Sequence, residues 1–277
     1  RLSLVGSEMC IRDSSYMDLN AIKAKLDALN SNGQDREKTD YTKIFWKPEL
    51  GKQTVRLVPS AFDPTMPFKE LKFHYGVGDR PMVALSNFGK QDPIEEFVNE
   101  LKKTSDKDNW SLAGKLNPKT RIFAPVIIRG EEDKGVRLWG FGITIYKALL
   151  ALIADEDIGD ITDVINGWDL VVEQVQGNPY PQTSVRIKPK QTELSDNTTQ
   201  VESWLKEQPD PMEVHKPMQY DFVKKQLQKY LDPTATTEED LPAAGAEVAS
   251  PKTDFTLETA TAGNQDTVSK FDDLFNE

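Results

Sequence analysis

Arginine and aromatic side chains recur together on two neighbouring segments, and they could bind a polyanion that carries flat rings. In residues 121–129 the even-numbered side chains are all apolar and share one face of a predicted strand, so that Arg121 and Phe123 share the other face. Arg137 and Trp139 repeat the pattern on the next predicted strand. Cations neutralise phosphates and rings stack on bases without reading sequence, so the pattern indicates a surface for single-stranded nucleic acid.

The same residues allow a plainer interpretation. Phe123 and Trp139 could pack into a second hydrophobic layer, with the arginines at its rim, because large aromatic side chains are mostly buried. Taken alone, the pattern favours this burial.

The charge is distributed unevenly along the chain. The formal net charge is -11, but residues 233–277 hold 2 Lys and Arg against 10 Asp and Glu. Residues 41–129 hold 15 against 10, so the middle of the chain is locally basic. A basic middle suits a polyanionic ligand, and most of the acidity belongs to the C-terminal tail.

The cysteine count, the apolar runs and the opening residues indicate the compartment and the start of the native chain. Cys10 is the only cysteine, which excludes an internal disulfide and a cysteine-based zinc site and suits a reducing, intracellular compartment. No apolar run approaches the ~20 residues of a membrane span. Residues 1–16 do not lead into the pattern that follows, and we interpret them as a non-native leader with Met17 as the start.

The spacing of apolar residues predicts short strands with helices among them. Strands are expected at 53–58, 69–75, 121–129, 136–141, 168–176 and 182–188. Helices are expected at 19–29, 93–103, 144–153, 200–208 and 218–231. Residues from 233 onward are expected to be disordered. The class is mainly β with added helices (α+β), and it suggests a five-stranded oligonucleotide-binding barrel, although other small barrels fit the strand count.

A carboxylate cluster raises the question of calcium or of a magnesium-dependent nuclease. Its members are Asp155, Asp157, Asp160 and Asp163. Gly159 stands one position too early for a calcium loop, and Asn166 replaces the bidentate glutamate. No partnered His or Lys accompanies the carboxylates, so the nuclease is a weaker rival.

The amino-acid sequence of the central region resembles that of a known family. W-S-L, K-T-R-I-F-A-P-V-I-I-R, G-V-R-L-W-G-F-G-I-T-I-Y-K-A-L-L-A-L-I-A and W-D-L-V-V-E-Q-V-Q-G, in that order, resemble the single-stranded DNA-binding protein of T4-like bacteriophages. The likeness covers residues 17–277 and is strongest over 110–177.

The resemblance implies a non-enzymatic protein, without a cofactor, that coats single-stranded DNA in phage replication, recombination and repair. It divides the chain into an arm for cooperative contacts (17–40), a DNA-binding core (41–232) and an acidic tail (233–277). Implied partners are single-stranded DNA, further copies along it and, through the tail, a polymerase, a helicase loader and a recombinase mediator. The implied location is the cytoplasm of the infected bacterial host.

The resemblance and the strand alternation give candidate site residues. The expected DNA contacts are Trp110, Lys119, Arg121, Phe123, Arg129, Arg137, Trp139, Tyr180, Arg186 and Lys188. The expected partner-binding tail is Phe271, Asp272, Asp273, Leu274 and Phe275.

The chain departs from the family pattern in two places. Family members often hold zinc with one His and three Cys, but here residues 86–97, beyond His74, contain no cysteine. We predict no zinc, and a loop held by the apolar side chains Met82, Leu85, Phe88 and Phe97. The family's arm carries adjacent basic residues before Ser or Thr, whereas only Lys23 and Lys25 stand here, which weakens the case for cooperativity. A third hypothesis is an acidic adaptor whose barrel and tail bind replication proteins.

Overall fold

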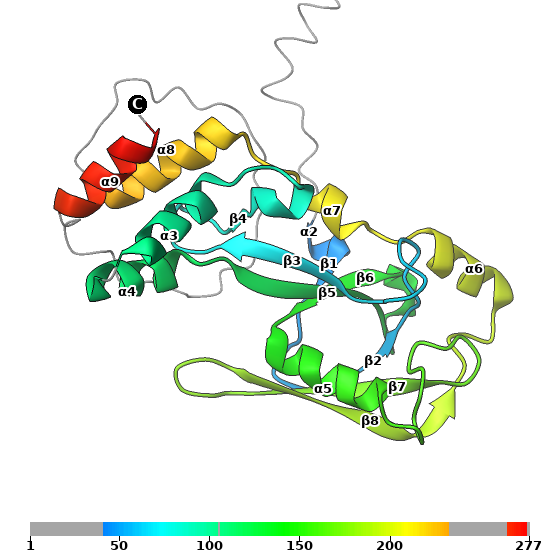
Figure 1. The fold of residues 1–277 in the computed structure, drawn as a ribbon. Coiled ribbons are helices and arrows are strands. Elements are labelled where there is room, and N and C mark those ends of the chain that lie inside the picture. Colours follow the sequence, from blue (N-terminus) through cyan, green and yellow to red (C-terminus); the bar gives the residue numbers. More distant parts are fainter. Residues whose placement is uncertain (1–40, 105, 233–264, 276–277) are drawn as a thin grey trace, which may run out of the picture. The chain divides into compact units, whose positions relative to one another are not determined.

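The structure of the protein is a computed structural model that describes residues 41–104, 106–232 and 265–275 (Figure 1). It is mixed α+β, with eight strands in one sheet. The strands are β1 (Phe45–Trp46), β2 (Gly51–Leu57), β3 (Lys69–His74), β4 (Met82–Val83), β5 (Lys119–Ile128), β6 (Arg137–Phe141), β7 (Gly167–Val175) and β8 (Gln182–Thr192).

Helices are inserted between the strands and follow them. The α-helices are α2 (Tyr41–Ile44), α3 (Pro93–Lys103), α4 (Lys107–Leu116), α5 (Ile143–Ile153), α6 (Thr198–Lys206), α7 (Pro211–Val214), α8 (Tyr220–Leu231) and α9 (Gln265–Phe275). Two 3-10 turns are η2 (Leu85–Phe88) and η3 (Glu132–Lys134). None of the described helices is long and apolar enough to cross a membrane.

The sheet is open within the described residues. Its strands pair in the order β1-β6-β5-β2-β7-β8, with β3 beside β5 and β4 beside β3. The prediction of an α+β fold is confirmed, whereas the five-stranded barrel is not.

Strand β5 is the centre of the sheet, since it pairs with β2, β3 and β6. Its even-numbered side chains, from Ile122 to Ile128, lie in the largest core cluster, as the alternation predicts. Helix α5 contacts β5 and β8 and closes the same cluster through Ile145 and Leu149. On the other face of β5, Phe123 joins Leu71 and Phe73 of β3 in a second cluster. Both faces of β5 are therefore covered.

Helices α3, α4, α8 and α9 share a separate apolar cluster (Figure 1). Helix α3 begins as predicted, because the Asp92 side chain accepts hydrogen bonds from the backbone N–H groups of Ile94 and Glu95 and Pro93 occupies the first turn. Its buried stripe contains Ile94 and Phe97. Tyr220 of α8 donates a 2.7 Å hydrogen bond to the Glu96 carboxylate and ties α8 to α3.

Two sequence predictions concern segments at the ends of the chain. The arm, with Lys23 and Lys25, and most of the tail lie outside the described residues. Residues 265–275 form α9, so the expectation of disorder throughout the tail is wrong there. The apolar spacing predicted no helix at residues 107–116, where α4 lies.

A buried arginine fixes the approach of β2 to the start of β7. Arg56 is fully buried and donates hydrogen bonds to the Asp163 carbonyl and, at 3.4 Å, to Thr192 Oγ1. Burial lowers the pKa of Arg56 to about 10, with the repulsion of Arg129 adding to the shift and the carboxylate of Asp169 opposing it. Gly167 leaves room for this guanidinium, because a Cβ there would overlap both Arg56 and the Asp163 carbonyl.

We expect Gly167→Ala to lower the free energy of unfolding by about 1 to 3 kcal/mol, since the added methyl group overpacks a buried site. Gly114→Ala is the matched control, because a Cβ there meets nothing within 4 Å on helix α4. That control should stabilise the protein by about 0.8 to 1 kcal/mol. Urea unfolding of both variants measures the difference, and equal stabilities would contradict the assignment of Gly167.

Candidate nucleic-acid interface

Four of the ten predicted DNA-contacting side chains are solvent-exposed, and six are partly or fully buried. The exposed ones are Trp110, Lys119, Tyr180 and Arg186. Lys188, Arg121 and Arg129 are partly buried, and Phe123, Arg137 and Trp139 are buried.

The first exposed group lies where α4 leads into β5. Trp110 is 54% exposed on α4, and its indole N–H donates a 3.0 Å hydrogen bond to the Thr104 carbonyl. Lys119 opens β5, and exposed Lys72 of β3 pairs with the next residue, Thr120. An exposed ring on α4 and two exposed cations near the start of β5 are thus present, but Lys119 pairs with Phe73 and Lys72 with Thr120, so the two lysines face opposite sides of the sheet. Lys72 was not among the predicted contacts, although its alternation with buried Leu71 and Phe73 marks it as outward-facing.

The second exposed group belongs to the β7–β8 hairpin. Tyr180 is 45% exposed in the connecting loop. Arg186 of β8 is exposed, whereas Val185 and Ile187 pack against the main core, which confirms the predicted alternation. Lys188 continues the Arg186 side of the strand.

Phe123 and Trp139 are buried, as the pattern taken alone favours, so neither ring is presented to a ligand in this structure. Trp139 is 1% exposed, and its ring lies 5.5 Å from Trp46 and 4.6 Å from Phe141 between centroids. Phe123 is 4% exposed beneath His215, with the ring centroids 5.2 Å apart. Each face of the central strands is covered, one by the main core and the other by the segment around α7 and His215.

The arginines on these strands are used by the protein itself. Arg137 is buried and forms an ion pair with Glu131, and the hydrogen bond from Arg137 lowers the pKa of that carboxyl. Arg121 donates a 2.9 Å hydrogen bond to the Gly140 carbonyl on β6. Both guanidinium groups are therefore committed to intramolecular contacts.

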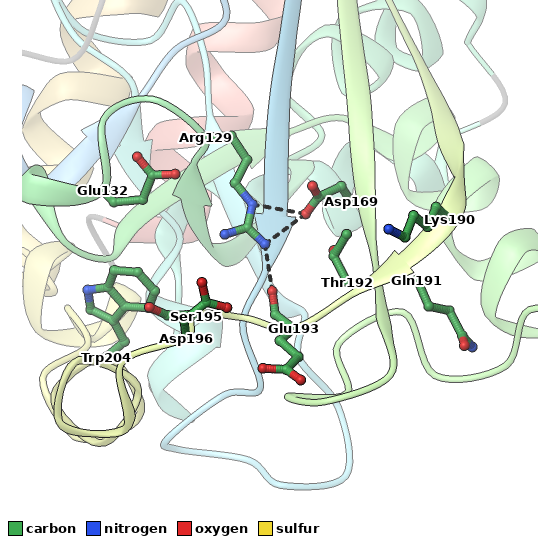
Figure 2. A pocket seen from close by; sticks show the side chains of 10 residues that line it. All are labelled: Arg129, Glu132, Asp169, Lys190, Gln191, Thr192, Glu193, Ser195, Asp196 and Trp204. Atoms are coloured by element: carbon green, nitrogen blue, oxygen red, sulfur yellow. Dashed lines mark hydrogen bonds and ion pairs between the residues drawn. The ribbon is translucent and has the colours of Figure 1, made fainter.

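Arg129 lies in a hollow of ≈ 590 Å³ whose other charged lining residues are mostly acidic (Figure 2). Its guanidinium is bonded to Asp169 at 3.0 Å and donates to the Leu194 and Glu193 carbonyls at 2.8 and 2.9 Å. The charged residues around it are Lys190, Glu132, Asp169, Glu193 and Asp196. Two cations against four carboxylates do not suit a polyanion, so the hollow does not support the prediction that Arg129 binds DNA.

A buried His and Asp lie where the family resemblance places a metal. His74 Nε2 lies 3.1 Å from Asp92 Oδ2, and ligand atoms of His74, Asp92 and Glu95 lie within 4.8 Å of one another. Asp92 Oδ2 also accepts the Leu85 N–H at 2.7 Å, while Oδ1 accepts two N–H groups of α3. The Asp92 carboxylate is thus saturated by hydrogen bonds, and Glu95 accepts one from the Ser86 hydroxyl. This donor set does not fit zinc, since zinc would have to displace contacts already made.

The Asp92 carboxylate joins three elements around the loop that we predicted to be held by apolar side chains. It connects β3 through His74, η2 through Leu85 and the start of α3. The predicted packing of Met82, Leu85 and Phe97 in one cluster is confirmed, but Phe88 packs against the cluster of Phe123 instead. Burial would raise the pKa of Asp92, but the hydrogen bonds from His74 and the backbone outweigh it and lower the pKa.

We expect Asp92→Asn to lower the free energy of unfolding at pH 7 by about 1 to 3 kcal/mol. A carboxyl whose pKa is depressed by folding stabilises the protein above its unfolded value, about 3.9, and loses that contribution as the pH falls through the folded pKa. The difference from wild type should therefore shrink below about pH 4.

Thermal unfolding with and without EDTA and across pH is the measurement, with the exposed Asp79→Asn as control. EDTA should leave the melting temperature unchanged in the wild type. Stoichiometric zinc, or a fall in melting temperature with EDTA, would contradict the metal-free arrangement.

Trp110 of α4 and Tyr180 of the β7–β8 loop are exposed, as are Lys119 and Arg186, whereas Arg121, Arg129 and Arg137 are bonded within the protein. The exposed rings and cations are the candidate contacts for nucleic acid. A family model described as "gp32 DNA binding protein like" matches residues 49–240, which include all ten predicted contacts. The chain belongs to this family of DNA-binding proteins. No curated protein matches the chain.

Proposed function

We propose that this protein binds single-stranded DNA without sequence preference and does not catalyse a reaction. The observation that carries the proposal is that Trp110 and Tyr180 remain about half exposed, each in a segment that also presents cations. A flat ring open to solvent can stack on an unpaired base, whereas the bases of a duplex are already stacked. Lys72, Lys119 and Arg186 would neutralise the phosphates.

The carboxylates that suggested a nuclease have another use. Asp160 Oδ1 accepts hydrogen bonds from the backbone N–H and hydroxyl of Thr162, and Asp163 Oδ1 accepts the N–H groups of Ile165 and Asn166. These are local turn contacts. In the described part of the chain only His74, Asp92 and Glu95 are grouped as metal ligands could be, so the magnesium-dependent alternative has no support from this cluster.

The biological role that we propose is the coating and protection of single-stranded DNA during phage replication, recombination and repair, in the cytoplasm of the infected host. Copies would associate along the DNA through residues 17–40, and the tail would recruit a polymerase, a helicase loader and a recombinase mediator. These roles rest on the resemblance and on membership of the DNA-binding family. The adaptor hypothesis would keep the tail contacts but not the DNA binding.

A titration of labelled oligo-dT in EDTA tests the central proposal. We expect saturable binding without any loss of DNA, because neither stacking nor phosphate neutralisation needs a metal. Absence of binding would favour the adaptor, and cleavage of the DNA on adding magnesium would favour the nuclease. Either result would overturn the proposal.

Substitution of the exposed rings should weaken binding. We expect Trp110→Ala and Tyr180→Ala each to reduce the binding free energy by about 1 to 3 kcal/mol through lost stacking. Trp139→Phe is the matched control, since Trp139 is buried in the core and should change stability but not affinity. Fluorescence anisotropy measures the affinities, and unchanged binding by both alanine variants would remove these rings from the interface.

The salt dependence should identify the phosphate contacts. For a single strand, log K falls with log salt by a slope of roughly 0.7 per phosphate neutralised. Arg186→Ala and Lys188→Ala should each make the slope shallower by about that amount. Lys206→Ala, an exposed lysine of α6 near Glu202, should leave it unchanged. Identical slopes for all four proteins would exclude β8 from the interface.

A further inference from the structure

A short helix close to the C-terminal end of the chain lies beside α8 (Figure 1). Phe271 of α9 is 1% exposed and belongs to the apolar cluster of α3, α4 and α8. Leu274 and Phe275 are partly buried against the same cluster. The apolar residues of the F-D-D-L-F sequence therefore face the protein's own helices.

The receptor surface is formed mainly by α3 and α8. The ring of Phe271 meets that of Phe97 on α3 edge to face, with centroids 6.0 Å apart. Val223 and Leu227 of α8 are buried in the same cluster. We call this surface the α3/α8 groove.

A cation completes the contact at the end of α9. Lys224 Nζ of α8 donates a 2.8 Å hydrogen bond to the Phe275 carbonyl and lies 5.2 Å from the centre of the Phe275 ring. Carbonyls in the last turn of a helix lack helical partners and carry partial negative charge, so a lysine there stabilises the docked helix.

The docked helix is separate from the element that holds it. Helix α8 ends at Leu231, and α9 begins at Gln265. With 11 residues, α9 is shorter than isolated helices that are stable in water. The apolar contacts of α9 and the Lys224 contact together offset the entropy lost when the helix orders, so docking and helix formation are coupled.

We propose that the α3/α8 groove is a reversible binding site for an amphipathic F-x-x-L-F helix and that α9 of the same chain is its resident occupant. While α9 is docked, Phe271 is covered and cannot be offered to another protein. A protein that captures α9 must therefore compete with the groove. Its own site should be apolar with cations at the rim, because residues 272 and 273 are acidic and Asp273 is exposed. The site concerns helix docking alone and stands whether or not the sheet binds DNA.

The test uses the full chain with a substitution that empties the groove. Phe271→Asp should release α9, because a charge cannot replace the buried ring. A fluorescein-labelled peptide of residues 265–277 should then bind this variant saturably and bind the wild type at least tenfold more weakly, because the wild-type groove is filled. The same peptide carrying Phe271→Asp should not bind. Asp273→Asn, on the exposed side of α9, is the matched control and should behave as the wild type.

Hydrogen exchange gives an independent measurement. Amides of α3 and α8 should exchange faster in Phe271→Asp than in the wild type, and the peptide should restore their protection. If Phe271→Asp unfolds the protein, Leu274→Asp, at a partly buried position, replaces it. Failure of the peptide to bind either folded variant would overturn the proposal. Self-association of the wild type that the peptide dissolves would also overturn it, since α9 would then occupy the groove of a second copy.

Discussion

The burial of both faces of β5 constrains the rest of the molecule. One face needs the core side chains of β2, β6 and α5, and the other needs β3 and the segment around His215. A strand packed in this way cannot present rings to a ligand without opening the protein. Any surface for nucleic acid must therefore be built at the ends of β5 and on neighbouring elements, where Trp110, Lys119 and the β7–β8 hairpin lie.

The helices beyond β3 depend on a hydrogen-bonded carboxylate. Asp92 accepts N–H groups from α3 and from Leu85 and contacts His74 on β3, so that sheet and helices meet at one buried side chain. Hydrogen bonds to the carboxylate fix the orientation of the groups that donate them, and they satisfy the buried N–H groups around it. The same α3 then supplies Phe97 to the groove that holds α9. The position of the C-terminal helix thus depends in part on the cap at Asp92, which fixes the helix that carries Phe97.

Periodicity predicted the elements better than it predicted which faces are free. Apolar alternation correctly predicted the strands at 121–129 and 182–188, and the helix expected at 93–103 is α3, because these signals are local. Alternation also separated Trp139 from Leu138, but it cannot tell which face meets water when both are covered. The pattern alone favours burial of Phe123, as observed, and only the resemblance assigns its ring to a ligand. The cover of Phe123, His215, lies far along the chain, so the sequence does not show it.

Long-range polar contacts were beyond the reach of the sequence for the same reason. Nothing in the spacing of Asp169 and Arg129 shows that they form an ion pair across strands. The spacing likewise does not show that the Glu131 carboxylate accepts a hydrogen bond from Arg137. The resemblance identified the family, and a model of that family of DNA-binding proteins matches residues 49–240. It could not show which of the matching side chains are exposed. Phe123, Arg137 and Trp139 are buried, whereas Trp110 and Tyr180 are exposed.

The position of His215 makes the cover over β3 and β5 sensitive to acid. Its ring lies 5.0 Å from Phe73 and 5.6 Å from Phe45, and no described group bonds its buried Nε2. Burial first, and Arg121 second, lower the pKa of His215 from 6.5 to about 4. The unfolded chain gains a proton at this site below about pH 6.5, whereas the folded chain stays neutral until about pH 4. Between about pH 6.5 and 4 the folded state, which holds His215 neutral among aromatic rings, therefore loses stability relative to the unfolded chain. Mild acid should loosen this cover before it protonates Asp92, whose pKa is lowered.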